Sequence, residues 1–326
     1  MHPERRKNMK IKSRKVAVIG VGNVGSHVAF SLVTRGIADE LVLIDIKEDK
    51  VKSEMLDLKD SLANLNSNVG IKIQDYSELK DAEIVVISAG PLPRFEQTRL
   101  DTLDDGVKII DDIMPKIIGS GFAGIFLVIT NPCDVITHYV LEKSGFPKNR
   151  VIGTGTSLDS ARFRRIAGDI LGIDPKSILG YSLGEHGDSQ MIPWSHIYVG
   201  GKPFKEYIGS KEEFKNTDLN KMLKDTSYAG WEVLSGKGAT CFGIGTAAST
   251  LIKSIFNNEH RIYPVSIFLD GEYGLKDVCL SVPAILGNNG VEEIIELVLT
   301  EDEQKQLTGS AEVIKTYIGK INKEVI

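Results

Sequence analysis

The feature that most limits the fold is a glycine triplet set between a predicted strand and a predicted helix. In VAVIGVGNVGSHVAF, Gly20, Gly22 and Gly25 have the spacing GxGxxG, directly after the apolar run at 15–19 and before the helical stretch at 26–35. Such a turn needs glycine for its tight bend, for close approach to a pyrophosphate and for helix–strand packing. The unit is typical of a dinucleotide-binding sheet.

An acidic residue follows where this interpretation requires one. The next apolar run, ELVLID, ends at Asp45, where a carboxylate can accept hydrogen bonds from ribose hydroxyls. A 2′-phosphate there would meet like charge, which favours NAD over NADP, although Lys47 lies two residues further on. The residues that we predict to bind the cofactor here are Gly20, Gly22, Asn23, Val24, Gly25 and Asp45.

The order of the apolar runs predicts an α/β fold in two parts. In the first half, buried runs alternate with helical stretches, as strands of a doubly wound parallel sheet do. These runs are 15–19, 40–44, 83–88 and 125–130, with helical stretches such as 26–35 and 107–118. The second half has short alternating runs, separated by Gly-Gly, Asp-Gly and Asn-Gly turns, and a long final helix. They lie at 196–204, 265–274, 276–286 and 301–324. We expect a Rossmann domain at 13–155 and a mixed α+β domain at 156–326.

Composition excludes several classes of function. The net charge of −5 argues against a nucleic-acid partner, and no apolar run reaches the ~18 residues of a membrane span. The cysteines, Cys133, Cys241 and Cys279, are widely spaced, so neither a disulfide framework nor a zinc site is expected. The basic stretch at 1–15 lacks the apolar segment of a signal peptide. We expect a cytoplasmic protein that binds no metal.

Polar clusters fall where the predicted sheet gives way to the second part. Asn131 follows a strand, and ligands of doubly wound sheets bind beyond the carboxyl ends of the strands. His186 lies between glycines on a loop that looks exposed, and an oriented histidine can carry protons near neutral pH. Asp159 is the candidate for orienting it and shares a helix face with Arg162.

A competing pattern occurs earlier in the chain. Tyr76 and Lys80 have the Tyr-x-x-x-Lys spacing of short-chain dehydrogenases, in which the phenol is the acid. The pair lies between the predicted third and fourth strands, too early for the layout of that family. A pattern with two fixed letters also recurs by chance, so we prefer the cluster around His186.

Together the motifs resemble the L-lactate/malate dehydrogenase family. The match runs over nearly the full chain, through VAVIGVGNVG, TNP, LDSARFR, GEHGDS and KGATCFGIG. The pattern is nearest to bacterial L-lactate dehydrogenases and L-2-hydroxyisocaproate dehydrogenases. The resemblance implies an NAD-dependent enzyme that interconverts a small L-2-hydroxy acid and its 2-keto acid, assembled as a homotetramer.

The resemblance also implies roles for the matched residues. His186 would exchange a proton with the substrate oxygen, Asp159 would hold the imidazole tautomer, and Arg162 would bind the substrate carboxylate through two parallel hydrogen bonds. Arg99, in EQTRLD, would polarise the carbonyl from a mobile lid. The other matched positions are Asn131 near the carbonyl and nicotinamide, Thr240 beside the substrate, and Ile244 as an apolar wall for the nicotinamide.

The position that selects the acid in this family lies six residues before the lid arginine and falls on Pro93. Lactate enzymes have glutamine there, and malate enzymes have arginine. Proline offers no charge to a second carboxylate, which counts against malate, although the adjacent Arg94 keeps malate open. We expect lactate and pyruvate, with a longer aliphatic 2-hydroxy acid as the alternative because the lid at 92–93 is apolar.

Two further expectations follow from the resemblance. A non-catalytic nucleotide-binding relative would be expected to lose part of the catalytic set, and this chain keeps all of it, so we favour an enzyme. Lactate dehydrogenases activated by fructose 1,6-bisphosphate pair an arginine with a histidine, whereas this chain has Arg164 but Leu179. We therefore expect no such activation.

Overall fold

A nine-stranded sheet runs through both halves of the chain in the computed structural model, which describes residues 13–91 and 102–324. Its strand order is β12-β11-β10-β6-β5-β4-β1-β2-β3. Strands β1 to β6 are parallel, and the remaining three add antiparallel at the β6 edge. The parallel strands are β1 (Lys15–Ile19), β2 (Glu40–Ile44), β3 (Gly70–Ile73), β4 (Ile84–Ile87), β5 (Ile125–Val128) and β6 (Val151–Gly153). The antiparallel strands are β10 (Arg261–Asp270), β11 (Lys276–Gly287) and β12 (Gly290–Ile294).

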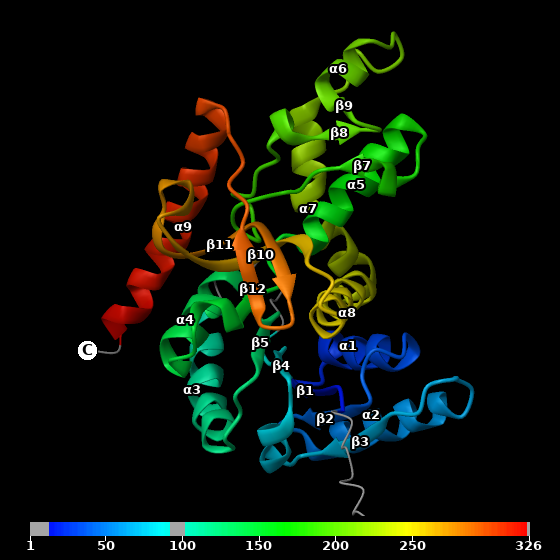
Figure 1. Ribbon diagram of the computed structural model, residues 1–326, viewed down its shortest axis with the longest axis vertical. Coiled ribbons are helices and arrows are strands. Elements are labelled where there is room, and N and C mark those ends of the chain that lie inside the picture. The colour runs from blue at the N-terminus through cyan, green and yellow to red at the C-terminus, as the bar shows by residue number, and fades with distance from the viewer. Residues whose placement is uncertain (1–12, 92–101, 325–326) are drawn as a thin grey trace, which may run out of the picture.

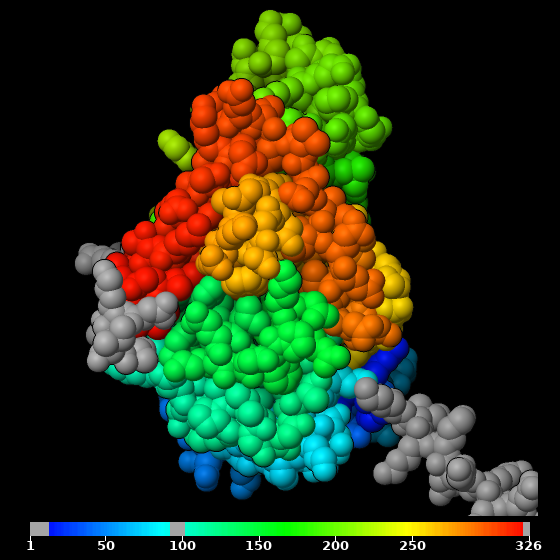
Figure 2. Space-filling view, turned by 60° about the vertical axis from the view of Figure 1, so that its left-hand side comes forward, coloured from blue at the N-terminus to red at the C-terminus, as the bar shows by residue number. Residues whose placement is uncertain are grey.

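Helices cover both faces of this sheet, so its central strands are buried on both sides. One face carries α1 (Asn23–Thr34), α2 (Glu48–Leu62) and α8 (Phe242–Phe256), and the other carries α3 (Leu103–Gly119), α4 (Cys133–Ser144) and α9 (Glu301–Glu324) (Figure 1). The buried residues of α3 form an apolar stripe at helical spacing that includes Ile110, Ile113, Met114 and Ile117, whereas α4 is buried at every position from Cys133 to Val140. Figure 2 shows α9, in red, lying along the outside of the molecule beside the gold and orange hairpin strands.

A smaller unit stands above the carboxyl end of the parallel strands (Figure 1). It contains α5 (Ser157–Leu171), α6 (Phe204–Gly209), α7 (Leu219–Lys237) and a sheet of β7 (Ile178–Leu179), β8 (Tyr198–Val199) and β9 (Lys202–Pro203). Its own apolar core includes the fully buried rings of Phe163 and Phe204, with Trp194 packed against both. This unit and the main sheet enclose the site described below.

The expected Rossmann sheet and α+β second part are confirmed, with one difference in arrangement. The hairpin strands of the second half extend the parallel sheet, because β10 pairs with β6 through Ser266 and Gly153. A side chain at Gly153 would place its Cβ 2.8 Å from that of Ser266, so glycine permits this close pairing. The division at residues 155 and 156 remains a prediction. Within the described ranges, no helix is long and apolar enough to cross a membrane.

The alternating run at 265–274 contains the second half of a strand and the turn that follows it. Strand β10 begins earlier, at Arg261, and ends at Asp270. The chain turns there because Gly271 adopts a φ of 135°, in the region that favours glycine. This is the Asp-Gly turn that the sequence indicated, whereas the start of the strand at Arg261 was not predicted.

Candidate active site

The glycine triplet forms a tight turn between β1 and α1. Gly20 has a φ of 88°, and a Cβ there would lie 2.4 Å from the backbone of Ala89, which follows β4. A Cβ on Gly25 would lie 1.9 Å from the carbonyl oxygen of Gly20. Gly22 precedes α1 without a side-chain cap, and a Cβ there would meet nothing within 4 Å. The turn therefore leaves open space at a helix N-terminus, where backbone N–H groups favour phosphate.

Asp45, at the end of β2, is bonded directly to this turn. Its Oδ2 accepts the N–H of Val21 at 2.9 Å, and its Oδ1 accepts the N–H of Lys47 at 3.1 Å. The Gln74 side chain holds the Asp45 backbone through two hydrogen bonds, of 3.0 and 2.6 Å. A carboxylate has about four acceptor positions, so these bonds leave Asp45 able to accept ribose hydroxyls as well.

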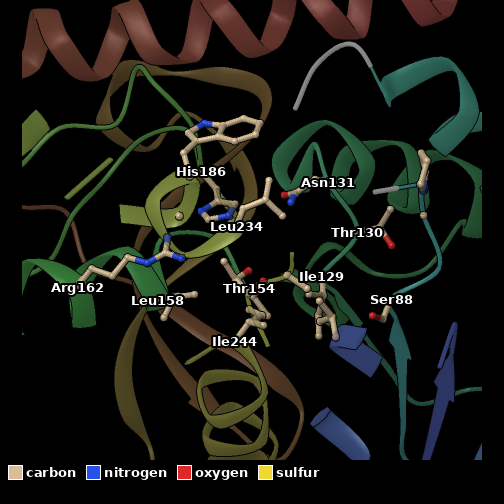
Figure 3. Close-up of a pocket in the computed structure, with 17 residues that line it drawn as sticks. Ser88, Ile129, Thr130, Asn131, Thr154, Leu158, Arg162, His186, Leu234 and Ile244 are labelled. Carbon is tan, nitrogen blue, oxygen red and sulfur yellow. The ribbon is translucent and has the colours of Figure 1, made fainter. Parts of the chain in front are cut away.

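A pocket lies between the carboxyl ends of the parallel strands and the second unit (Figure 3). Its lining on the sheet side is Val24, Ser88, Gly90, Pro91, Ile129, Thr130 and Asn131. The rest of the lining is Thr154, Leu158, Arg162, His186, Gly230, Trp231, Leu234, Ala239, Thr240 and Ile244. The sheet side is the place where a doubly wound fold binds a dinucleotide, so a second ligand would sit between the two sets.

One carboxylate bridges an imidazole and a guanidinium of this pocket. Asp159 is fully buried; its Oδ2 accepts Nδ1–H of His186 at 2.5 Å, and its Oδ1 accepts Nη1–H of Arg162 at 3.0 Å. Asp159 and Arg162 are three residues apart on α5, so both side chains leave the same face of the helix. Because the carboxylate accepts from Nδ1, the other ring nitrogen, Nε2, is the atom that can exchange a proton with a ligand. Figure 3 shows Arg162 and His186 together, with Asn131 on the other side of His186.

The loop that carries His186 differs from our expectation of an exposed loop. The His186 side chain is only 11% exposed, and Leu183, Gly184 and Glu185 are buried. Backbone bonds to neighbouring elements account for this burial, since Leu183 pairs with Met191 and Gly184 pairs with Ser281 of β11. Flanking glycines suggested an exposed turn, but here Gly184 permits close packing, because a Cβ would lie 2.7 Å from Ser310 Oγ.

Two buried polar atoms of the pocket have no hydrogen-bond partner in the described part of the chain. They are Oδ1 of Asn131, which lies beyond the end of β5, and Oγ of Ser88, which follows β4. The peptide bond between Asn131 and Pro132 is cis. A buried acceptor without a partner is costly, so the site suits a ligand that carries N–H donors. The carboxamide of a nicotinamide is such a group, and the polar atoms at the strand ends therefore fit NAD.

Among the described residues, we find neither a reactive thiol nor a metal-binding cluster at this pocket. Burial raises the pKa of the Cys133 thiol, at the start of α4, to about 12, so that it stays protonated at neutral pH. All three cysteines are free and buried. Across residues 13–91 and 102–324, no group of three His, Cys, Asp or Glu side chains is placed to hold a metal ion.

The predicted site residues fall into three groups. Val24, Asn131, Arg162, His186, Thr240 and Ile244 line the pocket, and Asp159 lies directly behind two of them. Gly20, Gly22, Asn23, Gly25 and Asp45 form the turn and its support. Pro93, Arg94 and Arg99 lie outside the described residues, and Tyr76 and Lys80 lie on a short helical turn away from the pocket lining.

Sequence reasoning missed several lining residues. Ser88 and Thr130 follow β4 and β5, so the rule that ligands bind at carboxyl ends of strands could have identified them. Trp231 and Leu234 come from α7 and belong to no motif. Their place in the pocket depends on how α7 packs against α5, which the sequence pattern does not specify.

The fold and the pocket together define an NAD-binding oxidoreductase, in which a histidine–aspartate pair faces the dinucleotide side of a Rossmann sheet. Residues 14–153 match the NAD binding domain of lactate/malate dehydrogenases, and residues 156–325 match the alpha/beta C-terminal domain of the same proteins. The chain belongs to the lactate/malate dehydrogenase family.

Curated relatives and solved structures agree with this assignment. The chain is 47% identical to L-lactate dehydrogenase 3 of Bacillus cereus, over 96% of this chain and 99% of that protein. It is 44% identical to an L-lactate dehydrogenase of Fusobacterium nucleatum, over 94% and 97% of the two chains. The crystal structure of a minor L-lactate dehydrogenase from Enterococcus mundtii, in a ligands-bound form, superimposes with a TM-score of 0.91 at 41% identity, covering 95% of this chain and 99% of that one.

The glycine turn generates the first prediction. A Gly25→Ala substitution should weaken NADH binding by about tenfold or more, because the new Cβ would displace the Gly20 carbonyl oxygen and so the turn. Quenching of tryptophan fluorescence by NADH measures the affinity. Gly119→Ala, at the end of α3 with open space around it, is the control. Unchanged affinity in the Gly25 variant would remove the turn from cofactor binding.

Proposed function

We propose that the protein is an NAD-dependent L-lactate dehydrogenase that interconverts L-lactate and pyruvate. The observation that carries the proposal is the buried Asp159, bonded at once to His186 and Arg162 beside the cofactor side of the pocket. Asp159 thereby holds an acid–base group, the imidazole, next to a carboxylate-binding group, the guanidinium. The similarity to proteins named L-lactate dehydrogenase supports lactate as the substrate.

Arg162 binds the carboxylate of the 2-keto acid. A planar guanidinium can donate two parallel N–H bonds to a carboxylate, which fixes both the position and the plane of the acid. The Asp159 contact at Nη1 holds the guanidinium in its orientation before substrate arrives. Pre-organisation of this kind lowers the entropic cost of binding.

His186 moves the proton. Its Nε2 donates a proton to the keto oxygen during pyruvate reduction and takes it back from the hydroxyl during lactate oxidation. Asp159 fixes the tautomer with the proton on Nδ1 and stabilises the imidazolium that lactate oxidation produces. NADH, when bound, supplies a hydride to carbon 2 of the keto acid.

The surrounding residues orient the reactants and exclude water. Asn131 accepts from the carboxamide or lies near the carbonyl, and Thr240 lines the substrate end. Ile244 is buried and gives the nicotinamide an apolar wall, which disfavours the charged oxidised ring. By the family resemblance alone, Arg99 would lie on a mobile lid and polarise the carbonyl when that lid closes.

The cofactor and the assembly are part of the same proposal. Asp45 disfavours the 2′-phosphate of NADP through like charge, so NAD is the cofactor. Residues 13–155 hold the dinucleotide, and residues 156–326 supply the acid–base and carboxylate-binding groups. We further propose a cytoplasmic homotetramer, on the resemblance to lactate dehydrogenases alone.

A second candidate is a dehydrogenase of larger aliphatic L-2-hydroxy acids. The observation that favours it is the apolar lining contributed by Leu158, Trp231 and Leu234, and the residues at 92–93 of the sequence are apolar as well. A branched aliphatic side chain of the substrate can pack against an apolar wall, as a methyl group can. Malate is the weaker alternative, because Pro93 offers no charge to a second carboxylate.

A panel of 2-keto acids separates these candidates. With NADH oxidation as the readout, kcat/KM should be highest for pyruvate, lower for 2-ketoisocaproate and lowest for oxaloacetate. A higher value for 2-ketoisocaproate would move the assignment to the larger acids, and a higher value for oxaloacetate would move it to malate. No turnover of any 2-keto acid would contradict the proposed function.

Removal of the imidazole should stop chemistry and spare binding. His186→Ala should lower kcat for pyruvate by about 100-fold or more, since general acid catalysis contributes that much. NADH affinity should stay within about twofold, because the residues that we propose to hold the dinucleotide do not include His186. His196→Ala, whose ring bonds Ser195 instead, is the control for loss of a histidine. Equal losses of turnover and NADH affinity would indicate a structural histidine.

Replacement of the guanidinium should act on substrate binding. Arg162→Lys should raise KM for pyruvate by about tenfold to 100-fold, because lysine cannot donate two parallel bonds to the carboxylate. Arg165→Lys is the matched control, since Arg165 lies on the same helix and pairs with the exposed Asp169. An unchanged KM in the Arg162 variant would exclude this residue from carboxylate binding.

A further inference from the structure

The loop that carries His186 is fixed by three successive backbone N–H groups, each of which donates to a different element. The donor–acceptor pairs are Gly184 with the carbonyl oxygen of Ser281 on β11 (2.9 Å), Glu185 with Ser310 Oγ on α9 (2.7 Å), and His186 with Asp134 Oδ2 on α4 (2.7 Å). Two of the acceptors are neutral and one is a carboxylate. The carboxylate bonds the residue whose side chain faces the ligand site.

The Asp134 side chain is itself buried and hydrogen-bonded to a second element. Its side chain is 1% exposed, and its other oxygen, Oδ1, accepts the hydroxyl of Ser281 at 3.3 Å. The Ser281 hydroxyl in turn accepts the N–H of Thr156, just before α5. The carboxylate therefore connects the histidine loop to β11 and, through Ser281, to the start of the helix that carries Asp159.

The burial of this carboxylate does not serve stability. Loss of water raises the pKa of Asp134 to about 6, although hydrogen bonds that include the His186 N–H oppose the rise. An ordinary aspartate has a pKa of about 3.9 when the chain is unfolded. The folded state thus binds a proton more readily than the unfolded chain, and this group lowers stability as the pH rises from about 4 to 6. At neutral pH the ionised form is retained at a cost.

We infer that Asp134 is a positioning residue for His186, and that its carboxylate fixes the peptide from which the imidazole projects. This inference rests on the proposed function. Two carboxylates then hold the two ends of one residue: Asp134 binds the backbone N–H and Asp159 binds Nδ1. With both ends held, Nε2 has one orientation toward the substrate. Catalysis is sensitive to shifts of about 1 Å in such a group.

The ionisable groups around Asp134 are consistent with a carboxylate at neutral pH. From the histidine loop it faces His186, which favours the ionised form, and Glu185, which opposes it. The Glu185 carboxylate accepts the N–H of Ser189 at 3.1 Å. The buried thiols of Cys133 and Cys279 lie nearby on α4 and β11, and burial raises the pKa of both, so neither carries charge.

The test is Asp134→Asn, which keeps the shape of the side chain and removes its charge. In pyruvate reduction at pH 7, we expect kcat to fall by about tenfold to 100-fold, as for a displaced catalytic group. KM for pyruvate and the affinity for NADH should change by less than about threefold, because Arg162 and the glycine turn are untouched. The melting temperature should not fall, because the substitution removes a desolvated charge.

The matched control is Glu303→Gln. Glu303 is also a buried carboxylate that accepts backbone and hydroxyl bonds, but its partners are Ser195 and Thr300, away from the histidine loop. We expect this variant to lose stability and keep kcat. An unchanged kcat in Asp134→Asn, or equal falls in kcat for the two variants, would overturn the positioning role.

A second test uses the wild-type protein and needs no substitution. As the pH falls from 7 to 5, protonation of Asp134 weakens its bond to the His186 N–H, so kcat for pyruvate reduction should fall several-fold while the fold persists by circular dichroism. If Asp134→Asn does not fold, this second test decides. A kcat that does not fall between pH 7 and pH 5 would then overturn the inference. An inactive wild type would instead count against the proposed function, which keeps the two failures distinct.

Discussion

The buried carboxylate of Asp159 is the interaction on which the site depends. It lies at the start of α5, without exposure to solvent, and accepts one hydrogen bond from His186 and one from Arg162. A buried charge is costly unless it is paired and hydrogen-bonded. Loss of either partner would therefore destabilise the carboxylate, and loss of the carboxylate would release both partners. In the proposed mechanism, one residue therefore sets the distance between the group that moves a proton and the group that binds the acid.

The rest of the fold brings other elements to this carboxylate. The parallel strands end together, so the residues that follow β4 and β5, among them Ser88 and Asn131, line the same side of the pocket. The extension of the sheet by β10 and β11 brings Ser281 beneath the histidine loop, where it contacts both Gly184 and Asp134. The antiparallel strands thus support a site whose pocket edge is formed by the parallel ones.

Much of this could be predicted from the sequence, because the informative signals are local. The GxGxxG turn, its flanking strand and helix, and the i, i+3 spacing of Asp159 and Arg162 are each set by a few neighbouring residues. What could not be predicted depends on contacts between distant segments. Trp231 enters the pocket through the packing of α7, and the bond between Asp134 and the His186 N–H joins residues 52 positions apart. The burial of the His186 loop was missed for the same reason, since its partners lie on β11, α4 and α9.

The most direct test is a crystal structure of the ternary complex with NADH and oxamate, an unreactive analogue of pyruvate. The account predicts the oxamate carboxylate on the guanidinium of Arg162, and the oxamate carbonyl oxygen within about 3 Å of Nε2 of His186, as a proton transfer requires. It also predicts that carbon 4 of the nicotinamide lies next to the carbonyl carbon of oxamate, the position to which hydride would be transferred in pyruvate. An imidazole turned away from the analogue, or an oxamate bound away from Arg162, would contradict the account.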